Sequence, residues 1–161
     1  MDVNGLKVAL YKRLPRRLQI EAVRLSTPNF TVGSLGLITY DGQHVLLVRQ
    51  SYRKGWSPPG GLLQRGETPT QGVAREVQEE IGLEVRFAPS HRASLDVGRQ
   101  TVSFLSAGLV AADAVFAPRG PEILEARWFP VTALPAMPFD YSEGMPAEDF
   151  DALRQVAGVR P

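Results

Sequence analysis

The sequence predicts an α+β fold, or mixed α/β sandwich, in which helices pack against a mixed β-sheet. Three observations predict it: a sharply delimited amphipathic helix in the middle of the chain, strand patterns on both sides of that helix, and helical patterns towards both ends. The chain has 161 residues, 43% of them hydrophobic and 22% charged, so it can bury one substantial core. We expect one domain at residues 30–161, preceded by a separate segment at residues 1–29.

The first segment is basic and amphipathic. Residues 1–26 hold six basic and two acidic side chains, which leave a net charge of +4. A helix that is interrupted or started at Pro15 is predicted by the apolar residues Leu10, Leu14, Leu18, Ile20 and Val23. We expect this helix to pack on the domain with its basic face in water, or to contribute to a homodimer. Binding to a membrane surface or to nucleic acid is the less favoured alternative.

Two strands are predicted before the central helix. Residues 30–40 are rich in apolar residues that partly alternate, and residues 44–50 form a mostly buried strand pattern. Asp41 and Gly42, between the two, are a hairpin turn signal. Residues 51–61 carry three glycines and two prolines, which predicts a loop.

The central helix has clear limits in the sequence. Thr68 precedes Pro69 and stands three residues before Gln71, which is the pattern of a capping box with proline at the first helical position. Gly82 suits the position just after the end of a helix. These signals predict a helix over residues 69–81.

Two faces of this helix differ in chemistry. At about 100° per residue, one face collects the aliphatic residues Val73, Ala74, Val77 and Ile81. Another face, centred roughly 120° away, collects Glu76, Glu79 and Glu80. Carboxylates at this spacing repel one another unless a cation lies among them, and a hard cation such as Mg²⁺ suits oxygen ligands. The pattern therefore predicts a metal site that can also hold metal-bound phosphates.

The rest of the chain predicts further strands and a final helix. Strand patterns cover residues 83–87, 91–97, 101–110 and 123–129, with a loop at residues 111–121. A short helix is expected at residues 131–134 and a final helix at residues 147–156. His44 and His91 fall within strand patterns, so we interpret them as structural residues rather than as metal ligands.

Composition excludes several classes of function. The net charge of +1 provides no basic field for a nucleic-acid polymer. The absence of cysteine excludes disulfides, thiolate metal sites and cysteine nucleophiles. No apolar run is long enough to span a bilayer, and no signal-peptide pattern is present. A cytoplasmic enzyme that acts on a small molecule is the simplest expectation.

Residues 61–83 resemble the Nudix box. The 23-residue segment agrees with that motif at every defining position: Gly61, Glu67, Arg75, Glu76, Val77, Glu79, Glu80, Gly82 and Leu83. The preceding segment, Trp56-Ser57-Pro58-Pro59-Gly60, resembles the usual lead-in to the box. The order of predicted elements resembles the Nudix fold over residues 30–150 and leaves the first 29 residues outside.

This resemblance implies a loop–helix–loop motif on an α/β/α sandwich. It implies Mg²⁺ or Mn²⁺ bound by Glu76, Glu79 and Glu80, together with the backbone carbonyl of Gly60. It also implies that Arg75 and Glu67 pair with each other and hold the loop and the metal-binding carboxylates in place.

The proton acceptor for an attacking water is not settled by the motif. Glu80 or Glu79 is the favoured residue within the box. In this family the base is sometimes a carboxylate outside the box, and Glu122 is the candidate here for both that role and an extra metal ligand. A plain surface carboxylate is an equally good interpretation of Glu122, and Glu125 is the weaker choice.

Several residues are candidates for substrate contacts. Arg49, Arg53 and Lys54 flank the predicted cleft and can meet phosphates, although each alone is more often a solvated surface charge. Trp56 and Phe139 can stack on a base, but packing in the core or a loop is the commoner role. The resemblance also suggests Asp140 as a residue that reads the base.

We therefore expect a Mg²⁺- or Mn²⁺-dependent Nudix hydrolase that cleaves the pyrophosphate linkage of a nucleoside diphosphate joined to another moiety. Family signatures of ADP-ribose, diadenosine polyphosphate and NADH enzymes are absent downstream of the box, which weakly favours a MutT-like nucleoside triphosphate substrate. An ADP-ribose or nucleotide-sugar pyrophosphatase is the alternative. A nucleotide-sensing module without catalysis is the alternative from another class, and isopentenyl diphosphate isomerase is disfavoured because its chemistry uses a cysteine.

Overall fold

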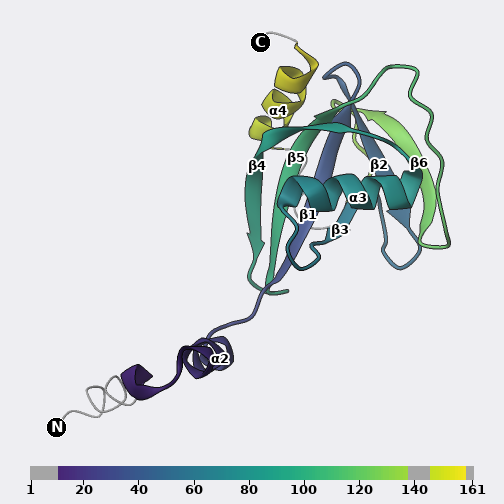
Figure 1. The fold of residues 1–161 in the computed structure, drawn as a ribbon. Coiled ribbons are helices and arrows are strands. Elements are labelled where there is room, and N and C mark those ends of the chain that lie inside the picture. Colours follow the sequence, from purple (N-terminus) through teal and green to yellow (C-terminus); the bar gives the residue numbers. More distant parts are fainter. Residues whose placement is uncertain (1–10, 138–145, 159–161) are drawn as a thin grey trace. The chain divides into compact units, whose positions relative to one another are not determined.

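The computed structural model describes residues 11–137 and 146–158, and its fold is drawn in Figure 1. The chain divides into two compact units, Met1–Thr31 and Val32–Pro161. In the first unit, helix α2 (Arg16–Ser26) begins directly after Pro15, as the sequence predicts. The backbone N–H and the hydroxyl of Thr27 both donate to the carbonyl of Val23, which closes the helix at its C-terminus.

The second unit contains two β-sheets with helices packed against them. Its strands are β1 (Thr31–Thr39), β2 (His44–Gln50), β3 (Gly60–Leu62), β4 (Arg86–Asp96), β5 (Thr101–Leu109) and β6 (Ile123–Pro130). A four-stranded sheet has the order β3-β1-β5-β4, and β2 pairs with β6 in a separate two-stranded sheet. The predicted α+β class with helices flanking sheets is thereby confirmed.

Helices α3 (Pro69–Ile81) and α4 (Ala147–Ala157) cover opposite sides of the strands. Alternate residues of β1 and β2 face different helices, since successive side chains of a strand point to opposite faces. Ile38, Leu46 and Val48 join the core cluster beneath α3. Leu37, Val45 and Leu47 join the cluster that contains Leu153 of α4. The result is an α/β/α sandwich (Figure 1).

Both helices agree closely with the prediction. Helix α3 has the expected limits, with a complete capping box between Thr68 and Gln71 and Gly82 in the left-handed conformation at its C-terminus.

Within the described ranges 11–137 and 146–158, every helix is too short or too polar to cross a membrane.

The turn at residues 41–43 does not form the predicted hairpin. Strand β1 pairs with β3 and lies beside β5, whereas β2 pairs with β6, so this turn carries the chain from one sheet to the other. Side chains satisfy its backbone: Thr39 Oγ1 accepts from Gly42 N at 2.8 Å, and Asp41 Oδ1 accepts from Gln43 N at 2.8 Å and His44 N at 2.9 Å. The prediction was wrong because a turn signal specifies a reversal of the chain but not the strand that each arm pairs with.

The structure adds strand β3 within the predicted loop. Its three residues pair antiparallel with β1, from Gly33↔Leu62 to Leu35↔Gly60. A Cβ atom on Gly60, which has a φ of +141°, would overlap the carbonyl oxygen of Ser34. Two glycines permit this close approach, but they also remove the alternating side-chain pattern by which a strand is recognised in a sequence.

Two later expectations were also wrong. The strands expected at residues 83–87 and 91–97 form one strand, β4, with a register shift between Phe87 and His91 that accommodates Pro89 at the edge of the sheet. The helix expected at residues 131–134 is a turn, with a hydrogen bond of 3.0 Å from Ala133 N to Pro130 O. A single turn gains too few hydrogen bonds to offset the cost of helix nucleation.

Candidate active site

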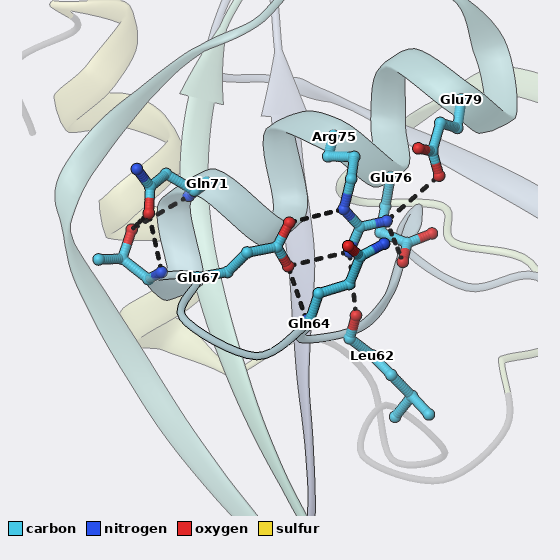
Figure 2. A network of polar contacts seen from close by, with 8 residues as sticks. Leu62, Gln64, Glu67, Gln71, Arg75, Glu76 and Glu79 are labelled. Carbon is cyan, nitrogen blue, oxygen red and sulfur yellow. Dashed lines mark hydrogen bonds and ion pairs between the residues drawn. The ribbon is translucent and has the colours of Figure 1, made fainter.

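Arg75 is the centre of a polar network that joins helix α3 to the preceding loop (Figure 2). Its Nε and Nη2 donate to the two carboxylate oxygens of Glu67, at 2.7 and 3.0 Å. Nη2 also donates to the carbonyl of Leu62 at 3.1 Å, at the end of β3. A bidentate guanidinium–carboxylate pair has a defined geometry, so this pair ties the loop, β3 and the helix together.

The charge of Arg75 acts strongly on Glu67. Hydrogen bonds from Arg75, and a further one from the backbone N–H of Gln64 at 2.7 Å, lower the pKa of Glu67 to about 2. The same hydrogen bond with Glu67 raises the pKa of Arg75 above its usual range. Both groups therefore stay ionised throughout the neutral range.

Glu76 and Glu79 share the remaining donor group of Arg75. Nη1 donates to Glu76 Oε1 at 2.8 Å and to Glu79 Oε2 at 3.2 Å (Figure 2). The side chain of Glu76 is 19% exposed and that of Glu79 is 60% exposed. A Cβ atom on Gly61 would lie 2.6–2.8 Å from the Glu76 carboxylate, so the glycine of the motif makes room for this side chain against β3.

Glu80 is the buried carboxylate of the group, with 7% of its surface exposed. The backbone N–H of Gly60 donates to Oε2 at 3.0 Å, and the side-chain amide of Gln50 donates to Oε1 at 3.4 Å. Burial raises the pKa of Glu80 to about 7 against the effect of these two donors, and the negative charges of Glu76 and Glu122 raise it further. Glu80 can therefore exchange a proton near neutral pH.

Glu122 lies where strands β2 and β6 meet. Gln50 pairs with Ile123, and Ser51 N donates to the carbonyl of Glu122 at 2.8 Å. Burial raises the pKa of Tyr52 to about 12, with hydrogen bonding to Glu122 and the negative charge of Glu122 as the next causes. The charge of Glu122 also reaches Glu80. Sequence reasoning missed Tyr52, because an aromatic residue after a strand carries no signal for a contact 70 residues away.

Glu125 is paired with two arginines of β2 and β6. It faces Arg49 across the β2–β6 pair, where Arg49 Nε donates to Glu125 Oε2 at 3.2 Å, and its other oxygen pairs with Arg127. Of the two acids considered outside the box, the structure therefore brings Glu122 and not Glu125 into the surroundings of Glu80.

The residues predicted to contact the substrate differ in their burial and in their partners. Arg49 is engaged with Glu125, Arg53 lies 5.5 Å from the centre of the Tyr52 ring, and Lys54 is exposed. Trp56 packs edge-on against Phe129, with ring centres 4.8 Å apart, and both rings are partly buried against the core cluster that contains Leu153 of α4. Phe139 and Asp140 lie outside the described residues.

The two histidines have structural contacts. His44 Nδ1 lies 2.7 Å from Asp41 Oδ2, and His91 Nδ1 lies 3.2 Å from Ser106 Oγ.

The acidic cluster has the donor atoms that a hard divalent cation requires. In the ranges that the structure describes, no three His, Cys, Asp or Glu side chains converge closely enough to form a metal site. Nη1 of Arg75 donates to both Glu76 and Glu79. The donor set is nevertheless all oxygen, and the charge of Glu76 acts unfavourably on ionised Glu80. A cation among these carboxylates would remove that repulsion. Glu76, Glu79 and Glu80 are thus the candidate ligands for such a cation, and the carbonyl of Gly60 stays a prediction from the family resemblance.

Comparisons with known proteins show the family of this chain. The model of the NUDIX domain family matches residues 30–147. A MutT-like protein of Streptomyces ambofaciens is 40% identical over 60 residues, or 37% of this chain and 39% of that protein. The NAD-capped RNA hydrolase NudC of Pseudomonas aeruginosa is 30% identical over 142 residues, or 83% of this chain and 48% of that protein. This chain thus spans less than half of the length of these two curated relatives.

A solved structure supports the same assignment. An ADP-ribose pyrophosphatase from Streptococcus suis superposes with a TM-score of 0.55 at 25% identity, over 81% of this chain and 92% of that chain. The family model covers most of the chain and includes the whole network around Arg75 and Glu80. The chain therefore belongs to the Nudix family of hydrolases.

Proposed function

We propose that this chain is a pyrophosphohydrolase that depends on a divalent metal ion, Mg²⁺ or Mn²⁺, and cleaves the diphosphate linkage of a nucleoside diphosphate joined to another moiety. The observation that carries the proposal is the position of Glu80. It is a buried carboxylate with a raised pKa, held by two donors beside Glu76 and within reach of the charge of Glu122.

The residues of the site suit this chemistry. Negative oxygens shield a diphosphate from water, and a divalent cation, when bound, supplies neutralising charge and acidifies bound water. Glu76, Glu79 and Glu80 would hold the cation, with Glu122 as an additional ligand. A carboxylate, for which Glu80 or Glu122 is suited, takes one proton from the attacking water. The water oxygen forms a bond to phosphorus, and the bond from phosphorus to the bridging oxygen breaks, which releases the second phosphate product.

Arg75 and Glu67 would act by positioning. The five hydrogen bonds that Arg75 donates orient Glu67, Glu76 and Glu79 and hold the backbone of β3 at Leu62, but neither Arg75 nor Glu67 needs to touch the substrate. Arg49, Arg53 and Lys54 remain candidates for phosphate contacts, and Asp140 for contact with the base.

The relatives and the sequence signatures favour different substrates within this class. The names of the relatives refer to NAD-capped RNA and to ADP-ribose, in which a diphosphate joins a nucleoside to a second group. The missing downstream signatures favour a nucleoside triphosphate instead. We therefore propose the diphosphate-linked nucleoside as the substrate class and leave the second group to experiment.

The test is turnover by the purified chain with Mg²⁺ or Mn²⁺. A panel of nucleoside triphosphates, ADP-ribose, dinucleotides and nucleotide sugars is followed by separation of the phosphorylated products. We expect at least one substrate to be hydrolysed and Glu80→Gln to reduce kcat by more than about 100-fold. Glu84→Gln, which neutralises an exposed carboxylate just after α3, is the matched control and should keep wild-type activity.

Two results would overturn the proposal. One is the absence of turnover across the whole panel, and the other is a Glu80→Gln variant that is as active as the wild type. Tight nucleotide binding without metal and without any product would indicate a sensing module instead.

A further inference from the structure

Gln50 is a buried polar residue whose contacts point towards Glu80. It is the last residue of β2, at a shift in the register between β2 and β6, and only 4% of its surface is exposed. Its side chain leaves the strand towards α3, where Nε2 donates to Glu80 Oε1 at 3.4 Å. The motif itself contains no residue of β2, so this contact adds a third element of structure to the site, besides α3 and β3.

Glu80 is thereby held at both of its oxygens. Gly60 N donates to Oε2 from β3, and Gln50 donates to Oε1 from β2. Glu80 itself stands in the last turn of α3. Three separate elements thus determine the orientation of one carboxylate, and rotation about the last side-chain bond of Glu80 would break both hydrogen bonds.

The other polar atom of Gln50 lies close to this pair. Gln50 Oε1 is buried and has no hydrogen-bond partner among the described residues. A buried acceptor without a partner is unfavourable, so an apolar side chain of the same size would suit packing alone better. Because Oε1 and Nε2 share one carbon atom, Oε1 is a second buried acceptor close to Glu80.

We propose that Gln50 is a positioning residue of the hydrolase site, which orients the carboxylate of Glu80 from strand β2. This inference rests on the role proposed above for Glu80. Gln50 acts through Glu80, so its loss should affect the chemical step and the binding of the cation rather than the affinity for the nucleotide.

The test uses Gln50→Met, which keeps the length of the side chain and removes both polar atoms. We expect kcat to fall about 10-fold and KM to change less than about 2-fold, since partners that orient metal ligands contribute about 10- to 100-fold to activity or metal affinity. Mn²⁺ affinity, measured by electron paramagnetic resonance of the free ion without nucleotide, should also fall about 10-fold.

Gln78→Met is the matched control. Gln78 lies on α3 and also has a buried Oε1 without a partner among the described residues, and no hydrogen bond between its side chain and Glu80 is found in the structure. This variant should keep the wild-type kcat and Mn²⁺ affinity. If Gln50→Met does not fold, Gln50→Asn, which retracts the amide by one methylene, is measured with the same readouts.

A double-mutant cycle separates this inference from the proposed function. In the Glu80→Gln background, Gln50→Met should cause no further loss of Mn²⁺ affinity, because the carboxylate that Gln50 positions has already been replaced by an amide. Wild-type kcat and Mn²⁺ affinity in Gln50→Met, alongside an inactive Glu80→Gln, would overturn only the inference about Gln50. An active Glu80→Gln would overturn the proposed function itself.

Discussion

Replacing Glu80 with glutamine should make the metal-free protein more stable at alkaline pH. Burial, with the charges of Glu76 and Glu122, raises the pKa of Glu80 to about 7 from the ordinary value of 4.5. The folded state therefore binds this proton more tightly than the unfolded state does. The protonated carboxyl of Glu80 therefore adds to the free energy of unfolding in full below pH 4.5, and this contribution is lost as the pH rises through 7.

The magnitude follows from the difference between the two pKa values. They differ by about 2.5 units (7 − 4.5), and each unit corresponds to about 1.36 kcal/mol, so ionised Glu80 costs the folded state about 3 kcal/mol at pH 8. The neutral amide of Glu80→Gln avoids this cost. Gln50 can rotate its side-chain amide so that the unpartnered Oε1 accepts from the new amide group.

The assay is urea unfolding in the presence of a chelator, for both proteins at about pH 4 and about pH 8. We expect the free energies of unfolding to agree at the lower pH, and Glu80→Gln to be more stable by about 2–3 kcal/mol at the higher pH. Glu84→Gln, at an exposed position, should show no such gain. Equal stability of Glu80→Gln and wild type at pH 8, or the same difference at both pH values, would refute the reasoning.

Three further predictions concern the loop, the opposite side of the sandwich and the first segment. Gly61→Ala should reduce kcat at least about 10-fold, because the added Cβ atom would displace the carboxylate of Glu76 that packs against β3. Gly98→Ala is the control, since a Cβ atom fits there, and it should leave kcat unchanged. Arg92→Met should lower the free energy of unfolding by about 3 kcal/mol, measured in urea, because it removes the two hydrogen bonds of 2.8 Å that the guanidinium donates to the buried carboxylate of Asp149. A chain of residues 30–161 should keep the turnover of the full chain, and complete loss of activity in a folded product would contradict the proposed domain boundary.

Local signals explain why the acidic helix is predictable. Thr68, Pro69 and Gln71 set its start and Gly82 sets its end through contacts within a few residues, so the sequence contains everything that these limits require. The spacing of Glu76, Glu79 and Glu80 on this helix depends only on helical periodicity. The aliphatic face that anchors the helix follows from the same periodicity, and Val73, Val77 and Ile81 are indeed buried.

Contacts between distant segments explain what was not predictable. The sequence could not tell that β1 and β2 belong to different sheets, because each strand pairs with a distant segment: β1 with residues 25 to 29 positions away in β3, and β2 with residues 73 to 86 positions away in β6. Glu122 and Glu125 are equally acidic in the sequence, and the β2–β6 register separates them by placing one near Tyr52 and the other opposite Arg49.

By itself, the sequence determined that this chain carries a capped helix with three carboxylates on one face, and hence a motif suited to metal-bound phosphates. Only the tertiary structure decided that these carboxylates differ: Glu79 is exposed, Glu76 is packed against Gly61, and Glu80 is buried between Gly60 and Gln50. The physical reason is that periodicity is a property of one helix, whereas burial, and the pKa that follows from it, depends on which strands pack around that helix.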